Sequence, residues 1–146
     1  MEVRKVDEGA RTTYVVVLGE GDEAAASLAQ LAKEEGLSAA RLTAVGAFQR
    51  ATVGWFDRQA KDYRRIAVDE QCEVLALTGD VALGPDGTPT VHAHVVLGLS
   101  DGTTRGGHLL EGHVWPTLEV VLDEPPTALR KTDRPDIGLA LIDLDE

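Results

Sequence analysis

Cysteine is almost absent from this sequence, and Cys72 is its single example. One thiol excludes an intrachain disulfide and is typical of proteins from a reducing compartment. Cys72 begins the apolar run of residues 72–77, where a small buried hydrophobic side chain is a more ordinary role than that of a nucleophile. The N-terminal residues lack the apolar segment of a signal peptide, and no run reaches the roughly 18 apolar residues that cross a bilayer. We therefore expect a cytoplasmic protein without a membrane segment.

Aromatic residues and positive charges are also scarce. Aromatics make up 4% of the chain, so the core must rest on Val, Leu, Ile and Ala. The 25 acidic residues outnumber the 14 Lys and Arg, which gives a formal net charge of −11. Such a surface repels nucleic acid phosphates and anionic lipid. The clustered basic residues Arg58, Lys61, Arg64 and Arg65 leave a local basic patch as an alternative, but charges on an alternating strand more often mark a solvated face, which is the preferred interpretation.

Hydrophobic patterning predicts a strand-rich chain with one main helix near the N-terminus. Residues 14–18 are apolar and β-branched, which is typical of a buried strand. Asp22 is placed to cap a helix that ends at Gly36. The region 127–136 is polar and is expected to be a surface loop. Further strands are expected at residues 41–48, 51–56, 63–68, 73–83, 90–99, 103–110, 114–122 and 137–144.

Short links between these strands favour a largely antiparallel or mixed sheet over repeated βαβ units. The length of 146 residues suits one domain, with no internal repeat and no credible linker. The prediction is a single compact domain over residues 1–146, of the α/β class and the α+β type.

All four histidines lie within one stretch, and three of them are expected to converge. His92 and His94 are two apart in a predicted strand, so both point to the same face. Residues 100–102 suit a three-residue hairpin loop with Gly102 in the left-handed conformation. The resulting register places His94 directly opposite His108, with Cβ atoms about 5 Å apart. A bulge at residues 106–107 would instead turn His108 away, although these glycines also allow a close backbone approach.

Three neutral imidazoles at one point are typical of an open metal site, which predicts a metal or small-ligand site at His92, His94 and His108, with zinc or another divalent metal as the ion. The alternative is a set of half-buried histidines that bond to backbone or Glu groups. Glu119 is a candidate fourth ligand, imidazole partner or general base, or else a charge at a subunit boundary. His113 is a weaker candidate ligand because its direction is not fixed. A zinc-dependent enzyme, with a water on the three histidines and Glu119 as base, is the alternative function.

The ordered motifs of the chain resemble the plants and prokaryotes conserved (PPC, or DUF296) domain family. The resemblance is carried by residues 91–98, 101–102, 106–109 and 117–122, with residues 46–48, 55–56, 63 and 73–80 upstream in the same order. It covers nearly the whole chain, from Tyr14 to Leu144.

The resemblance implies a stand-alone prokaryotic-type member that assembles as an oligomer, commonly a trimer, and acts as a binding or regulatory protein. The histidine pattern of the family maps onto His92, His94 and His108, while His113 is a departure from it. Plant members carry AT-hooks that bind DNA, and this chain has no Arg-Gly-Arg-Pro core. Direct DNA binding is therefore not expected, whereas a homo-oligomer and protein partners are.

Overall fold

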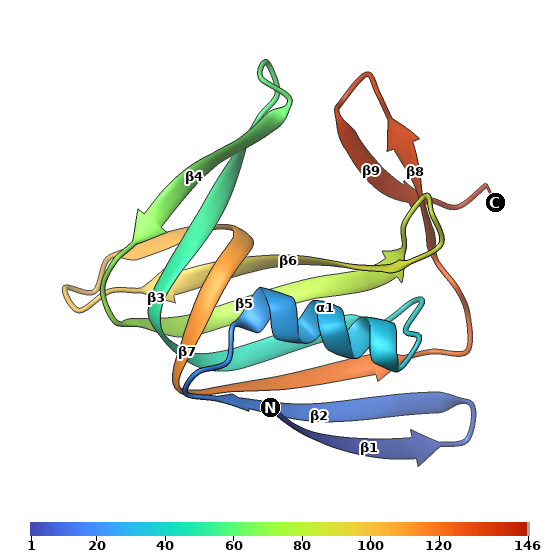
Figure 1. The fold of residues 1–146 in the computed structure, drawn as a ribbon, viewed down its shortest axis with the longest axis horizontal. Coiled ribbons are helices and arrows are strands. Elements are labelled where there is room, and N and C mark those ends of the chain that lie inside the picture. Colours follow the sequence, from blue (N-terminus) through green and yellow to red (C-terminus); the bar gives the residue numbers. More distant parts are fainter. Residues whose placement is uncertain (146) are drawn as a thin grey trace.

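One sheet dominates the fold. In the computed structural model, which describes residues 1–145, nine strands join this sheet (Figure 1). The strands are β1 (Glu2–Glu8), β2 (Arg11–Gly19), β3 (Arg41–Asp57), β4 (Asp62–Val68), β5 (Cys72–Leu83), β6 (Pro89–Gly98), β7 (Thr104–Glu124), β8 (Arg130–Arg134) and β9 (Leu139–Asp143). Strand pairs are antiparallel except for one parallel bridge between β5 and β8. The expected mixed sheet is confirmed.

Helix α1 (Ala24–Glu34) packs its apolar side against the sheet (Figure 1). It follows two strands rather than beginning the chain, and its side chain Leu28 is fully buried in the common core. The predicted cap is wrong by one residue, because the carboxylate of Glu23 accepts hydrogen bonds from the first helical N–H groups. Asp22 instead closes the preceding turn by accepting from Gly19 N. No helix in the described chain is long and apolar enough to span a membrane.

The two longest strands were each expected as a pair of strands. β3 and β7 run through the expected breaks and pair with each other, and local register shifts accommodate the irregular positions. One half of β7 lies between β2 and β3, and the other half lies between β3 and β6. The polar residues Gln49 and Arg50 of β3 suggest a link in the sequence, but they remain in the ladder as an exposed segment.

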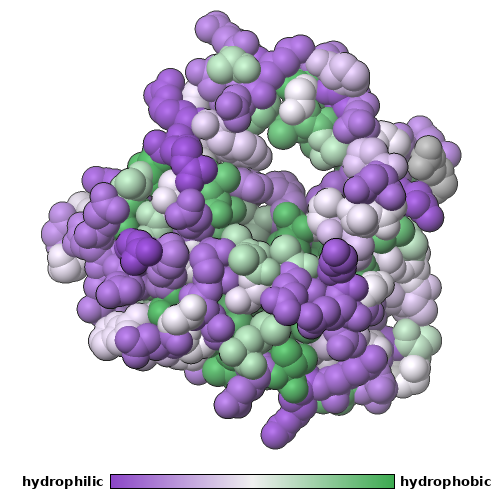
Figure 2. All heavy atoms as spheres, viewed as in Figure 1, coloured by the Kyte–Doolittle hydropathy of each residue, from purple (hydrophilic) through white to green (hydrophobic). Residues whose placement is uncertain are grey.

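The C-terminal part of the chain forms a hairpin from β8 and β9. The expected loop at residues 127–136 is therefore wrong in part, since β8 pairs antiparallel with β9 there. Leu83 N donates to Leu129 O at 2.8 Å and joins the hairpin to the end of β5. The hairpin stands opposite the extended β3–β4 hairpin (Figure 1). Figure 2 shows the molecule hollowed between these two hairpins, with hydrophobic atoms at the rim.

Candidate metal centre

The hairpin of β6 and β7 brings three histidines together. Gly102 adopts a φ of 81° in the connecting loop, and Leu99 N bonds to Thr103 O. The register continues without a shift, so His94 pairs with His108 as the sequence predicted. His92 lies two residues before His94 on β6 and presents its ring to the same side.

The geometry of the three rings fits a metal ion. One ligand atom from each of His92, His94 and His108 lies within 4.8 Å of the others. The Nε2 atoms of His92 and His94 are 3.1 Å apart. Two nitrogen ligands of a tetrahedral zinc, at bond lengths of about 2.0–2.1 Å, are separated by about 3.3 Å. The observed spacing is close to that value, so the pair needs little movement to share one cation.

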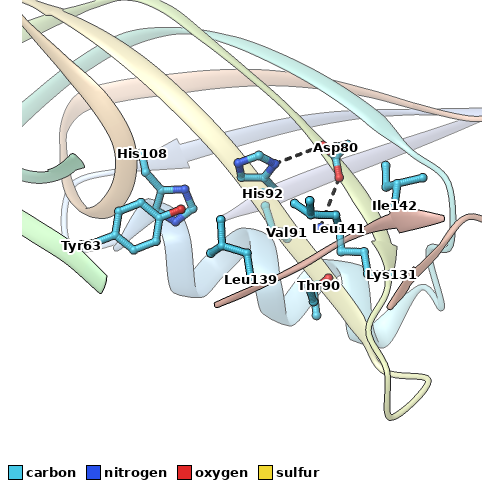
Figure 3. A pocket seen from close by; sticks show the side chains of 11 residues that line it. Tyr63, Asp80, Thr90, Val91, His92, His108, Lys131, Leu139, Leu141 and Ile142 are labelled. Atoms are coloured by element: carbon cyan, nitrogen blue, oxygen red, sulfur yellow. Dashed lines mark ion pairs between the residues drawn. The ribbon is translucent and has the colours of Figure 1, made fainter. Parts of the chain in front are cut away.

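Asp80 orients the first of these rings. The Oδ2 atom of Asp80 on β5 lies 3.4 Å from His92 Nδ1, and the Nε2 atom of that ring is left facing His94. The other oxygen, Oδ1, lies 3.4 Å from Lys131 Nζ on β8 (Figure 3). A carboxylate behind a metal-binding imidazole fixes the tautomer and the direction of the ring. Asp80 thus connects the histidine cluster to the C-terminal hairpin.

His108 is the most buried member of the cluster. The rings of Tyr63 and His92 both stack on it, with centroid distances of 4.6 Å and 5.4 Å. Burial, followed by the neighbouring His92, His94 and Lys131, lowers the pKa of His108 to about 4. Burial also lowers the pKa of His94. These imidazoles are neutral near pH 7, which is the state that binds a metal.

A buried nitrogen without a hydrogen-bond partner is a second indication that the site fits a metal ion. Nδ1 of His108 is buried and has no hydrogen-bond partner among the described residues. A buried polar atom without a partner costs free energy, and such an atom in a folded protein often marks a missing ion or water. The three imidazoles therefore have the donor types and the spacing that a divalent metal requires.

The paired glycines allow a close approach instead of producing a bulge between β6 and β7. A Cβ atom on Gly107 would lie 2.5 Å from the carbonyl oxygen of Gly54 on β3. That approach lets β7 pass tightly over β3 immediately before His108. Of the two interpretations of these glycines, the close approach is the one observed.

The structure does not bring Glu119 to the cluster. Glu119 pairs with Val17 of β2 and Val45 of β3, in the half of β7 remote from the half that pairs with β6. Its side chain is exposed on the face of the sheet opposite the buried Leu118 and Val120. The proposed roles of Glu119 as ligand or base are therefore not supported within one chain.

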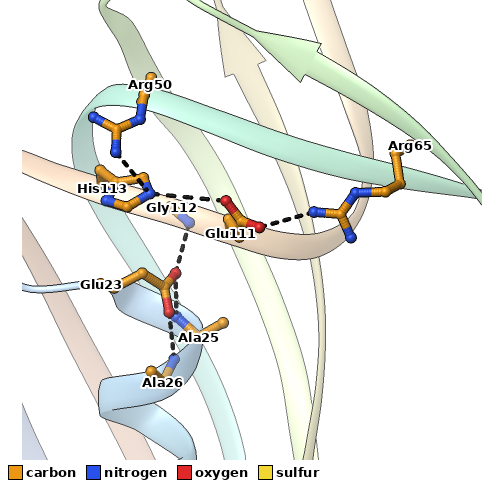
Figure 4. Close-up of polar contacts among 8 residues, drawn as sticks. All are labelled: Glu23, Ala25, Ala26, Arg50, Arg65, Glu111, Gly112 and His113. Carbon is orange, nitrogen blue, oxygen red and sulfur yellow. Dashed lines mark hydrogen bonds and ion pairs between the residues drawn. The ribbon is translucent and has the colours of Figure 1, made fainter.

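His113 belongs to a separate polar network (Figure 4). Its Nε2 lies 3.3 Å from Arg50 Nη2 and 3.8 Å from a carboxylate oxygen of Glu111. Glu111 in turn forms an ion pair of 2.8 Å with Arg65. The ring is thus committed to surface charges away from the three converging histidines.

Two further expectations are confirmed. Cys72 is 2% exposed and packs in the core as a free thiol. Burial is the main cause that raises the pKa of this thiol, which makes it a poor nucleophile. The four basic residues at positions 58, 61, 64 and 65 are exposed, as expected of a solvated face. Arg64 lies over the ring of Trp55, and Arg65 pairs with Glu111.

Sequence reasoning missed Asp80, Lys131 and Tyr63 as residues of the site. A usable signal existed for Asp80, because the turn at residues 84–87 sets a β5–β6 register that places Asp80 opposite His92. Tyr63 and Lys131 reach the cluster through the packing of two hairpins remote in sequence. No local pattern marks that packing.

The chain is similar to known proteins over most of its length. Residues 6–125 match the sequence model of the Plants and Prokaryotes Conserved domain. A PPC protein of Pyrococcus horikoshii is 31% identical, with a TM-score of 0.83 and coverage of 97% of this chain and 94% of that one. A metal-containing protein of Archaeoglobus fulgidus is 29% identical, with a TM-score of 0.81 and coverage of 97% and 96%. A candidate DNA-binding protein of Bacteroides thetaiotaomicron is 26% identical, with a TM-score of 0.88 and coverage of 99% of both chains.

A longer protein also contains a similar segment. The bifunctional protein GlmU of Synechococcus sp. strain JA-3-3Ab is 36% identical over 116 residues. The match covers 78% of this chain and 17% of GlmU. The likeness is thus confined to a small part of that larger protein.

Proposed function

Because the chain belongs to the Plants and Prokaryotes Conserved domain family and assembles three imidazoles at one point, we propose that it is an oligomeric, metal-dependent binding protein. The metal is zinc or another divalent cation, held by His92, His94 and His108. The convergence of one ligand nitrogen from each ring within 4.8 Å carries the proposal. A cytoplasmic location is part of it, since the single cysteine is a free, buried thiol.

Neighbouring side chains hold the metal-binding rings in position. Asp80 holds His92 by its Nδ1, and Tyr63 and His92 clamp the ring of His108 by stacking. A metal on three protein ligands keeps a coordination position for a ligand and supplies Lewis-acid character there. The metal-containing relative from Archaeoglobus fulgidus supports this assignment by likeness.

Metal analysis of protein prepared without a histidine tag tests the site. We expect about one divalent ion per chain in the parent protein and its loss in the variant His94→Ala. His113→Ala is the matched control, because this histidine lies in the separate network with Arg50, and it should retain the metal. A metal content well below one ion per chain that is the same in the parent protein and in His94→Ala would contradict the proposal.

Assembly as a homo-oligomer, with a trimer as the expected state, is supported by an apolar sheet face. Val15 and Val17 of β2, Val121 of β7 and Val45 of β3 lie on adjacent strands and are 38–57% exposed. They share the side of the sheet opposite the core, and Glu119 lies among them. Exposed apolar patches of this kind mark contacts with another protein. This placement favours the subunit-boundary role for Glu119.

Light scattering tests the assembly. The parent protein should give a mass of about three chains, and Val45→Lys should shift the mass toward the monomer because it places a charge in the apolar face. Ser100→Lys, at an exposed position on the β6–β7 loop, is the control and should leave the mass unchanged. A monomer mass for the parent protein would contradict the proposal.

Direct DNA binding is not part of the proposed function, although one similar structure is of a candidate DNA-binding protein. The formal charge of −11 disfavours contact with phosphates, and the basic side chains Arg64 and Arg65 are engaged by Asp57 and Glu111. An electrophoretic shift assay at physiological salt should give no specific complex at micromolar protein. A tight, sequence-selective shift would overturn this part.

A further inference from the structure

A cavity of about 450 Å³ opens directly beside the histidine cluster (Figure 3). His92 and His108 form part of its wall, so a molecule in the cavity faces the same point as the three imidazoles. Its volume lies within the range of sites for small organic ligands, which is about 300–1,000 Å³. Tyr63 of β4 lies at one side, and the β8–β9 hairpin lies at the other.

The wall has one apolar side and one polar end. Leu139, Leu141 and Ile142 of β9 supply aliphatic surface, to which Val91 of β6 adds. The polar end is formed by His92, His108 and Asp80, with Tyr63 at one side and Lys131 at the other (Figure 3). A ligand that fits this wall has a hydrocarbon part and a single polar head that is directed at the histidines.

The charges at the polar end favour an anion. The Lys131 side chain is only 10% exposed, and among the described residues its ionic partner is Asp80, at 3.4 Å. Within the described part of the chain, the buried Oδ1 of Asp80 has no hydrogen-bond partner of good geometry, and Oδ2 of the same carboxylate faces His92. One carboxylate thus serves two groups. A divalent cation on the histidines and the ammonium of Lys131 together carry more positive charge than Asp80 balances, and this excess favours an anionic ligand.

We propose that the cavity binds a small aliphatic carboxylate, with its acid group at the metal ion and near Lys131 and its chain along Leu139, Leu141 and Ile142. The proposal rests on the proposed function, because the acid group needs the metal. A carboxylate fits better than a phosphate, since the lining residues include one ammonium and no arginine fork.

Most of the apolar wall comes from a segment outside the family match. That match ends at residue 125, before β8 begins, whereas the histidines lie within it. A single parallel bridge, Leu83 to Arg130, pairs the hairpin with the sheet. The family region therefore supplies the cation site, and the hairpin of this chain determines the size and shape of the hydrocarbon part.

Protein loaded with Co²⁺ tests the proposal, because the visible absorption of the ion reports a change in its ligands. Straight-chain carboxylates from acetate to octanoate are titrated in turn. Each should change the spectrum, and affinity should rise about fourfold for each added CH₂ that becomes buried, until the cavity is filled. This series in the parent protein decides the question even if a variant fails to fold.

Two variants separate the head from the chain of the ligand. Lys131→Met should weaken every member of the series roughly tenfold and leave the dependence on chain length intact. Leu141→Ser should flatten that dependence and leave acetate unaffected. Arg130→Met and Leu144→Ser are the matched controls, because both residues are exposed and neither lines the cavity.

The outcomes are distinguishable. If Co²⁺ does not bind, or if it binds equally well to His94→Ala, both the metal site and the carboxylate proposal are contradicted. Binding of Co²⁺ at the histidines with no dependence on chain length would overturn the carboxylate proposal alone. If alkylphosphonates bind more tightly than carboxylates of the same chain length, the cavity prefers a different acid group, and the carboxylate proposal is wrong.

Discussion

The carboxylate of Glu23 accepts a hydrogen bond of 2.7 Å from the backbone N–H of Gly112, 89 positions later in the chain (Figure 4). The same carboxylate accepts from Ala25 N and Ala26 N at the start of α1. One side chain therefore caps the helix and fastens it to β7, midway between the half of β7 that holds His108 and the half that pairs with β2. This carboxylate adds to the backbone hydrogen bond from Val114 N to Asp22 O, which also joins the start of the helix to β7.

Replacement of Glu23 should destabilise the protein beyond the loss of an ordinary cap. Glu23→Ala removes the acceptor of three backbone donors, and we expect a decrease of about 1–3 kcal/mol in the free energy of unfolding. Chemical denaturation followed by circular dichroism measures it. Glu20→Ala, at an exposed position in the preceding turn, is the control and should change the free energy little. Equal effects of the two substitutions would refute the linking role.

A side chain at Gly112 should be poorly tolerated for a different reason. A Cβ atom there would lie 2.5 Å from the ring of Phe48, which is fully buried. Gly112→Ala should cost about 1–3 kcal/mol of stability by overpacking, and Phe48→Leu in the same chain should restore part of the loss. Gly19→Ala is the control, because nothing lies within 4 Å of its added Cβ. A double variant no more stable than Gly112→Ala alone would contradict the steric explanation.

The histidine geometry was predictable because local rules determine it. The turn at Gly102 sets the register, and the period of two along β6 sets the side on which His92 and His94 lie. The continuous register to His108 shows that the adjacent glycines serve β3 packing rather than a bulge in this hairpin. Alternation along a strand and one turn thus sufficed for the three imidazoles.

The cavity was not predictable by the same means. Most of its apolar wall comes from β9, which pairs with β8, and in the described chain β8 has one ladder pair with β5, Leu83–Arg130. The polar residues of β8, such as Asp133 and Arg134, have the composition of a loop, and only pairing with β9 makes them a strand. The prediction of the helix cap was wrong because Asp22 and Glu23 are both acidic, and sequence alone does not distinguish them. The carboxylate of Asp22 accepts from Gly19 N in the preceding turn.

The thiol of Cys72 should react slowly with disulfide reagents. Burial, then the negative charges of Glu70 and Glu73, raise the pKa of this thiol, while a weak contact of 3.9 Å to Phe48 O opposes the shift. Because the thiolate is the reactive form, its fraction at pH 8 is lower than for an ordinary cysteine, and the rate should still be rising at higher pH. We expect native protein to react on the order of a hundredfold more slowly than protein in guanidinium.

The matched control for that experiment places the thiol at the surface. In the double variant Cys72→Ala, Ser100→Cys, the cysteine occupies an exposed loop position, and it should react rapidly with a lower midpoint in its pH–rate profile. The same slow rate at both positions would show that neither burial nor the nearby charges control Cys72.

Asp80 should control metal affinity through His92. Asp80→Asn keeps the shape of the side chain but removes the charge that lies 3.4 Å from His92 Nδ1. We expect metal affinity to fall about 10–100-fold, as is usual when the carboxylate partner of a metal-binding imidazole is lost. Competition with a chromophoric chelator measures the affinity directly, and the smaller rise of the melting temperature on adding metal gives a second readout.

The control variants for Asp80 separate orientation from general loss of charge. Glu73→Gln removes an exposed carboxylate from the same strand, and Lys131→Met removes the other ionic partner of Asp80. Both should bind the metal with nearly the parent affinity, since neither changes the contact behind His92. If Lys131→Met lowers the metal affinity as much as Asp80→Asn does, the Asp80–Lys131 ion pair as a whole supports the site. The carboxylate would then have no separate role in orienting the ring of His92.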